Sequence, residues 1–124
     1  MVASESVIAS TKIAARASLE KLATGLVAID LSEQLVLSEV FLIVTGANSP
    51  QVSAIADEVE RKMTEAGQKP TRRENGSEWI LIDYSDLVVH IQSSELRRYY
   101  MLDRLWNDCP VIALDLETDD VSHA

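Results

Sequence analysis

Hydrophobic residues in the first third of the chain follow a helical spacing and then give way to runs of strand length. The spacing predicts a helix over residues 6–23, ended by Gly25. Residues 27–31 are typical of a short strand, and residues 40–45 form a continuous apolar run, as in a strand buried on both faces. The inward stripe of the helix is predicted to contain Ile8, Ala15, Leu19 and Leu22.

A turn and a second amphipathic helix come next. Residues 46–50 read Gly-Ala-Asn-Ser-Pro, which predicts Ser49 as the N-cap and Pro50 as the first helical residue. Gly67 is placed to end this helix. The inward stripe is predicted to consist of Val52, Ile55, Ala56, Val59 and Met63. The exposed side is expected to carry two i,i+4 ion pairs, Asp57 with Arg61 and Glu58 with Lys62.

The second half of the chain predicts a hairpin and a final helix. Residues 78–83 and 87–91 have the composition of two strands joined by a short connection, and residues 70–73 are a candidate edge strand. A helix is predicted over residues 94–107, before Pro110. The alternation of helices and strands predicts an α/β fold, with helices packed on a mixed β-sheet.

Length and charge bound the organisation and the partners. The 124 residues fit a single domain, which we place at residues 1–108, followed by an acidic C-terminal tail at 109–124 with a candidate short strand at 111–114. The net charge of −9 disfavours binding to nucleic-acid phosphates, because that binding requires neutralising positive charge. A basic protein partner is the better electrostatic match.

Compartment and cysteine usage follow from the same composition. No apolar run approaches the roughly 18 residues that a membrane-spanning helix needs, and the first residues lack a basic leader. We therefore expect a cytoplasmic protein. The single cysteine, Cys109, excludes an internal disulfide, and its apolar neighbourhood predicts a buried, unreactive thiol.

Signals for catalysis are weak. The turn at 46–50 has one glycine and no lysine, so it matches neither phosphate-binding fingerprint, and a tight strand-to-helix reversal explains it. Asp83, Asp86 and His90 are the one acid and histidine grouping worth testing as a metal site. In a hairpin, His90 would lie about 10 Å or more from the turn, too far to share an ion with both carboxylates. We expect no metal, no cofactor and no enzyme activity.

The aromatic residues indicate a protein-binding surface. Five of the six lie between residues 79 and 106, in a segment that also contains arginines, and these residue types dominate interface hot spots. Helical phase divides the last helix into two sides. The predicted inward side carries Tyr99, Leu102, Leu105 and Trp106. The predicted solvent side carries Arg97, Tyr100 and Arg104, which makes Arg97 and Tyr100 candidate contact residues.

The same segment carries a family signature. The run from Trp79 to Ile91, WILIDYSDLVVHI, resembles the Iojap/RsfS ribosome-silencing pattern W-x-L-x-D-[YF]-x-D-x-V-V-H-I. Downstream, Arg97, Tyr100, Leu102, Leu105 and Trp106 match its continuation. Upstream, residues 44–46, 48–49 and 51–52 resemble its strand-turn-helix segment. The sequence departs from the family where Asn75 splits a Glu-Gly pair, where Gln92 replaces a common phenylalanine, and where Glu39-Val40 replaces Ala-Asp.

The resemblance implies a ribosomal silencing factor. Such a factor binds the large ribosomal subunit through large-subunit ribosomal protein fourteen, blocks joining of the small subunit and represses translation when nutrients fail. The resemblance also implies that free copies pair as homodimers. The partner-binding positions that it implies are Trp79, Asp83, Tyr84, Asp86, His90, Arg97 and Tyr100.

A nucleotidyltransferase-like fold is implied as well, and with it an alternative function as a nucleotide-handling enzyme. That superfamily holds metal with two carboxylates one residue apart, about a dozen residues after a Gly-Ser turn. Here Asp57 and Glu58 are adjacent on a predicted helix and point about 100° apart. The catalytic carboxylates are therefore absent, and the fold alone does not imply the activity.

Overall fold

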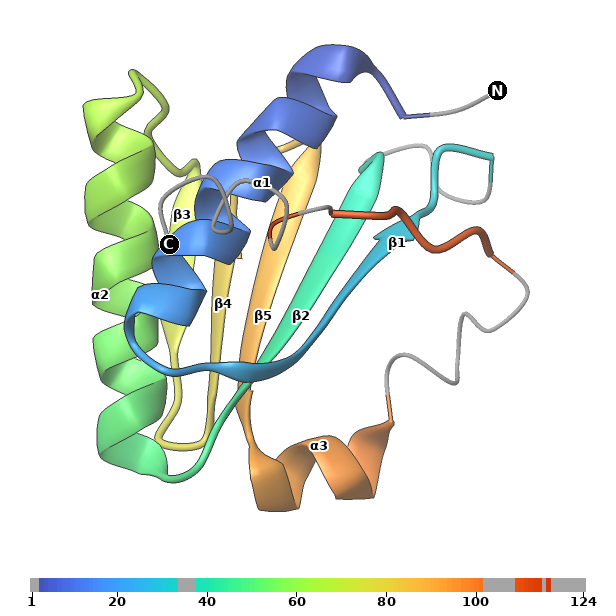
Figure 1. The fold of residues 1–124 in the computed structure, drawn as a ribbon. Coiled ribbons are helices and arrows are strands. Elements are labelled where there is room, and N and C mark those ends of the chain that lie inside the picture. Colours follow the sequence, from blue (N-terminus) through green and yellow to red (C-terminus); the bar gives the residue numbers. More distant parts are fainter. Residues whose placement is uncertain (1–2, 34–37, 102–108, 115, 117–124) are drawn as a thin grey trace.

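A computed structural model describes residues 3–33, 38–101, 109–114 and 116, and it confirms the α/β prediction (Figure 1). A five-stranded mixed sheet carries two long helices on one face and a short helix at one end. The elements of the described residues are α1(Glu5–Glu20), β1(Thr24–Asp30), β2(Val40–Gly46), α2(Ser49–Glu65), β3(Arg72–Asn75), β4(Trp79–Asp83), β5(Leu87–Ser93) and α3(Ser94–Tyr100).

The sheet has the strand order β1-β2-β5-β4-β3. Its two central strands, β2 and β5, run parallel, and the three other pairs are antiparallel. The apolar run predicted to be a doubly buried strand is β2, which confirms that prediction. The predicted hairpin is β4 and β5, also confirmed. The predicted edge strand exists but is shifted towards the C-terminus, at β3.

Helix α1 packs through small residues rather than through the predicted leucines. Ala14, Ala15 and Ala17 are buried, and the buried Thr11 and Ser18 hydroxyls donate to carbonyls one turn earlier, at 2.7 and 2.9 Å. These short side chains let the helix lie close to the sheet and to α2. The prediction of an inward Leu19 and Leu22 is wrong, since they are 37% and 78% exposed.

The end of α1 is a Schellman motif, in which the residue after the C-cap takes a left-handed conformation. That residue is Leu22, at φ 64°, with its N–H donating to Leu19 O (3.0 Å) and the Ala23 N–H donating to Ser18 O (3.1 Å). The prediction that Gly25 ends the helix is therefore wrong. Gly25 lies inside β1.

Helix α2 confirms its predicted stripe, since all five apolar positions are fully buried, and Gly67 follows its end at φ 86°. The predicted N-cap is off by one residue. Asn48, not Ser49, caps the helix, and its Oδ1 accepts from Gln51 N at 3.0 Å. Ser49 is thus the first helical residue and Pro50 lies in the first turn, where its missing N–H leaves no bond unmade.

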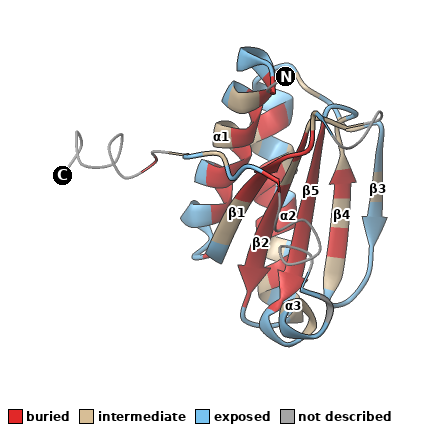
Figure 2. Cartoon of the chain, turned by 90° about the vertical axis from the view of Figure 1, so that its right-hand side faces the viewer, coloured by how far each residue is buried: buried red, intermediate tan, exposed pale blue. Residues whose placement is uncertain are grey.

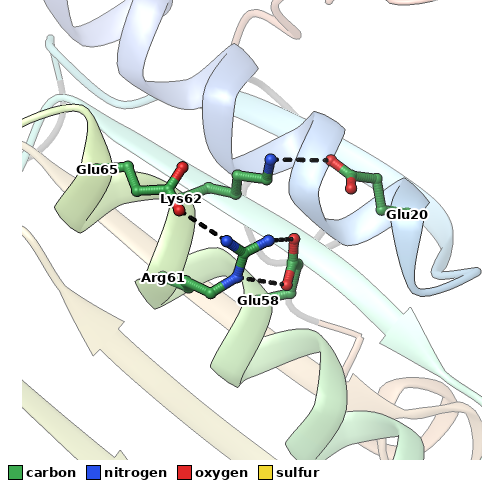
Figure 3. Close-up of polar contacts among 5 residues, drawn as sticks. All are labelled: Glu20, Glu58, Arg61, Lys62 and Glu65. Carbon is green, nitrogen blue, oxygen red and sulfur yellow. Dashed lines mark hydrogen bonds and ion pairs between the residues drawn. The ribbon is translucent and has the colours of Figure 1, made fainter.

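The ion pairs predicted along α2 are wrong. Arg61 instead bridges Glu58 (2.7 Å) and Glu65 (2.7 Å) on its own helix (Figure 3). Lys62 reaches across to Glu20 of α1 at 3.9 Å (Figure 3). Asp57 pairs with Arg73 of β3 at 2.9 Å. Lys62 and Asp57 therefore pair with neighbours on α1 and β3, while Arg61 pairs within α2 with glutamates other than the predicted aspartate.

The C-terminal part departs from the prediction at two points. The helix predicted over 94–107 ends at Tyr100, because Met101 caps it in a left-handed conformation at φ 50°. Leu102, Arg104, Leu105 and Trp106 lie outside the described residues. The predicted strand at 111–114 is reduced to a single bridge between Val111 and Ile29, flanked by hydrogen bonds that tie Pro110 and Ile112 to β1.

Candidate partner-binding surface

Strand alternation gives the sheet two different faces. The helix side of β2, β5 and β4 carries apolar residues that form one core with α1 and α2. On the opposite side, which faces the viewer in Figure 2, neither of the two long helices α1 and α2 lies over the strands, and among the described residues Cys109 packs there against Ile29, Leu31 and Ile43. We call this side the open face. Its residues on the three inner strands are Phe41, Ile43, Thr45, Trp79, Leu81, Asp83, Val88, His90 and Gln92.

His90 lies at the centre of the open face and is 5% exposed. Its ring packs edge-on against Phe41 (4.6 Å between centroids), and the Trp79 indole N–H donates to its Nδ1 at 3.2 Å. Burial lowers the pKa of His90 to about 4, so the ring is neutral at neutral pH. With Nδ1 accepting, the ring proton sits on Nε2, which is buried without a hydrogen-bond partner in the described structure. His90 thus holds the Trp79 ring in place.

Gln92 is the second buried polar group on the open face. It is fully buried and lies in register with Thr45 and Trp79. Neither its amide nitrogen nor its oxygen has a hydrogen-bond partner in the described structure. A buried amide left unsatisfied costs about 1–3 kcal/mol. The sequence pointed to this buried amide in one way: Gln92 stands where a phenylalanine is common in the resembled family.

Asp83 and the hairpin connection are organised by local hydrogen bonds. The carboxylate of Asp83 accepts from the Ser85 backbone N–H at 2.8 Å, and Ser85 takes a left-handed φ of 72°. Arg72 of β3 lies 3.6 Å from the same carboxylate. Asp83 is paired with Val88 across the hairpin, and His90 lies opposite Leu81. No group of three acids, histidines or cysteines in the described residues is placed to bind a metal.

Tyr84 and Asp86 lie on the helix side of the hairpin connection rather than on the open face. The ring of Tyr84 packs against the helix-side core, and its hydroxyl is buried with no partner in the described residues. Burial, with the nearby Glu60 carboxylate, raises the pKa of Tyr84 to about 12, so the phenol stays protonated. Both residues line a cavity of about 250 Å³ against the start of α1, beside Ser6 and Ser10.

Helix α3 lies at the end of the sheet where β2 and β5 finish (Figure 1). Arg97 was predicted on the solvent side of this helix, and Tyr99 on the inward side. The structure reverses both. Arg97 is half-buried and donates to Gly25 O and, at 2.6 Å, to Thr45 Oγ1, whereas Tyr99 is 81% exposed. Nothing is described of the Tyr100 side chain, although its backbone closes the helix.

Comparison with known proteins decides the family. The family model described as "Ribosomal silencing factor during starvation" matches residues 4–124. The chain is 38% identical over 106 residues to Ribosomal silencing factor RsfS of Bacillus subtilis, which spans 84% of this chain and 90% of that protein. It is 35% identical to RsfS of Halalkalibacterium halodurans, again over 84% of this chain and 91% of that protein. The chain belongs to the family of ribosomal silencing factors.

Solved structures and a plant relative agree with this assignment. A crystal structure of a Chromobacterium violaceum protein superposes with a TM-score of 0.77 at 31% identity, covering 80% of this chain and 84% of that one. A Bacillus halodurans crystal structure gives 0.72 at 34% identity, with 82% and 94% covered. Protein Iojap of maize chloroplasts is 27% identical over 84% of this chain and 46% of its own length. The Iojap/RsfS resemblance is confirmed.

Within this member of the family, the seven positions that the family signature implied lie in three places. Trp79, Asp83 and His90 share the open face. Tyr84 and Asp86 lie beside the α1 cavity, and Arg97 and Tyr100 belong to α3. The two adjacent carboxylates of α2 are engaged in ion pairs, Glu58 with Arg61 and Asp57 with Arg73. Among the described residues, no helix is long and apolar enough to cross a membrane.

Proposed function

We propose that this chain binds the large ribosomal subunit through large-subunit ribosomal protein fourteen and blocks joining of the small subunit. Bound on the intersubunit side, it represses translation under nutrient limitation. The observation that carries the proposal is the family match over residues 4–124, supported by relatives that are aligned over nearly their whole length. Occlusion is steric and needs no chemical step.

The open face supplies the features of a contact surface. Trp79, Phe41 and Leu81 are half-buried there, so part of each side chain is accessible to a partner. The buried ring of His90 packs beside them. A tryptophan held by a neighbouring ring buries a large area on binding at little entropic cost. The net charge of −9 favours a basic partner and steers its approach. His90 acts from beneath, by holding Trp79.

Cosedimentation with purified large subunits tests the proposal. Wild-type protein is expected to sediment with them and to slow association with small subunits in a light-scattering assay. Trp79→Ala is expected to weaken binding about 30-fold or more, which is the loss of a hot-spot side chain worth 2 kcal/mol or more. Thr64→Ala, at an exposed site on α2, is the matched control and should bind as the wild type does.

Two results would contradict this function. The first is wild-type protein that does not bind purified large subunits. The second is a folded Trp79→Ala variant, checked by circular dichroism, that binds with unchanged affinity. Nucleotide turnover by the purified chain that is lost on substituting Asp83 would instead favour the nucleotide-handling alternative. A pull-down with isolated large-subunit ribosomal protein fourteen identifies the component that is bound.

A further inference from the structure

We infer that Arg97 is a positioning residue, which with Gly25 and Thr45 fixes the orientation of α3 at the edge of the partner-binding surface. The inference rests on the proposed function, because it assigns an indirect role to a position that the family signature marks for partner binding. What α3 presents outwards is then Arg98 and Tyr99, both exposed.

The contacts of Arg97 point into the fold. One guanidinium nitrogen donates both to Gly25 O in β1 and to Thr45 Oγ1 in β2, at 2.6 Å for the second bond. Thr45 is only 8% exposed, so a macromolecular partner cannot reach its hydroxyl. Arg97 thereby joins α3 to the ends of two strands that are separated from it by 72 and 52 residues in sequence.

Gly25 makes room for this contact. A Cβ atom at position 25 would lie 2.9 Å from Arg97 Nη1 and 3.2 Å from Thr45 Oγ1. Its φ of +59° is also a conformation that residues with a side chain rarely adopt. The glycine, the threonine hydroxyl and the arginine therefore form one unit, which we call the α3 lock.

The α3 lock matters because α3 has only 7 residues and cannot be stable alone. Its first turn is fastened by Ser93, whose hydroxyl caps Leu96 N at 3.1 Å and bonds to Glu78 at 2.9 Å. One turn later, Arg97 hydrogen-bonds to the sheet at Thr45, and Met101 then ends the helix. Without the lock, the remaining described hydrogen bonds that hold α3 to its surroundings lie at its start, from Ser93 to Glu78 and from Ser94 to Gly46 O.

A double-mutant cycle separates positioning from direct contact. Thr45→Val removes the acceptor but nearly keeps the shape, and Arg97→Ala removes the donor. Each is expected to weaken large-subunit binding about tenfold, the loss of a hydrogen bond to a charged group. The double variant is expected to bind no more weakly than Arg97→Ala alone, because both changes break the same unit. Thr64→Val is the matched exposed control.

Amide hydrogen exchange supplies a readout that does not need the ribosome. In Thr45→Val, Arg97→Ala and Gly25→Ala, the amides of α3 are expected to exchange faster, while those of β5 keep their protection. Faster exchange throughout β5 would mean general unfolding and would overturn the local role. Unchanged α3 exchange in Arg97→Ala would overturn it as well.

The binding measurements also distinguish positioning by Arg97 from direct contact with the partner. If Thr45→Val binds as tightly as wild type while Arg97→Ala does not, or if the two losses multiply in the double variant, Arg97 contacts the partner directly and the inference is wrong. Wild-type protein that fails to bind large subunits contradicts the proposed function instead. Hydrogen exchange then still decides whether the α3 lock positions the helix.

Discussion

The two faces of the sheet are built on different principles. The helix side is an apolar core in which the fully buried Thr11 and Ser18 hydroxyls donate to backbone carbonyls. The open face buries a histidine and a glutamine among its apolar residues. Among the described residues, four buried side-chain atoms lack a hydrogen-bond partner, and three of them belong to His90 and Gln92.

The unsatisfied polar groups make the open face the better candidate for a binding surface. Unsatisfied buried polar groups destabilise a fold, and proteins retain them chiefly at functional sites. Here they lie directly beneath Trp79 and beside Thr45, the strand residue that anchors Arg97. On the proposed function, the helix side carries the stability of the domain, and the open face carries the groups proposed to serve partner binding.

Acid is expected to destabilise the domain through His90, which is buried on the open face. The pKa of His90 falls from 6.5 to about 4 on folding, so the unfolded chain binds more protons between these values. Stability is therefore expected to fall as pH falls through this window, by a total on the order of 3 kcal/mol. Urea unfolding of the wild type at pH 7 and at pH 5 measures the first part of this loss.

The histidine contribution is isolated by His90→Phe, which keeps a ring of similar size and cannot titrate. The carboxylates titrate in both proteins, so the difference between the two pH profiles reports His90 alone. The variant is expected to lose less stability than wild type between pH 7 and pH 5. Identical profiles would show that His90 is not held neutral by burial.

Substitution of Gln92 is expected to stabilise the domain, whereas acid destabilises it. Gln92→Met replaces the unsatisfied amide with an apolar chain of similar length and is expected to raise the free energy of unfolding by about 1–3 kcal/mol. Gln51→Met is the matched control on the helix side. Gln51 accepts from Ala47 N at 2.5 Å and donates to Lys21 O and Leu22 O, so its loss should destabilise. A destabilised Gln92→Met variant would contradict the contrast between the faces.

Local patterns predicted the helix side well where large apolar residues form it. The run that became β2, the turn before α2 and the stripe of α2 each depend on spacing within one element, which a sequence displays directly. The stripe of α1 was mispredicted because, apart from Val7, its buried positions are alanine, serine and threonine, which are too small or too polar to mark an inward face in the sequence. The capping of α1 by Leu22 was missed because glycine is the expected residue there.

The open face and α3 depend on contacts between distant parts of the chain. Helical phase correctly separates Arg97 from Tyr99, but it does not say which side faces inwards. The arginine was assigned to solvent because its acceptors, on β1 and β2, are invisible to a helical wheel. In the same way, Asp57 paired with Arg73 across 16 residues rather than with Arg61. Spacing along the sequence could not predict which charged groups pair across long distances in the chain.

The smallest expected effect on stability concerns the strained backbone at the end of α1. Leu22 is 78% exposed and holds a left-handed φ of 64° at the end of α1. Leu22→Gly removes this strain and is expected to raise the free energy of unfolding by about 1 kcal/mol. Leu22→Ala keeps the strain while removing the apolar side chain, so it should leave stability nearly unchanged. Thermal unfolding of the three proteins compares them. A Leu22→Gly variant no more stable than Leu22→Ala would contradict the strain at position 22, and a Leu22→Ala variant clearly less stable than the wild type would show that the leucine side chain stabilises the turn despite its exposure.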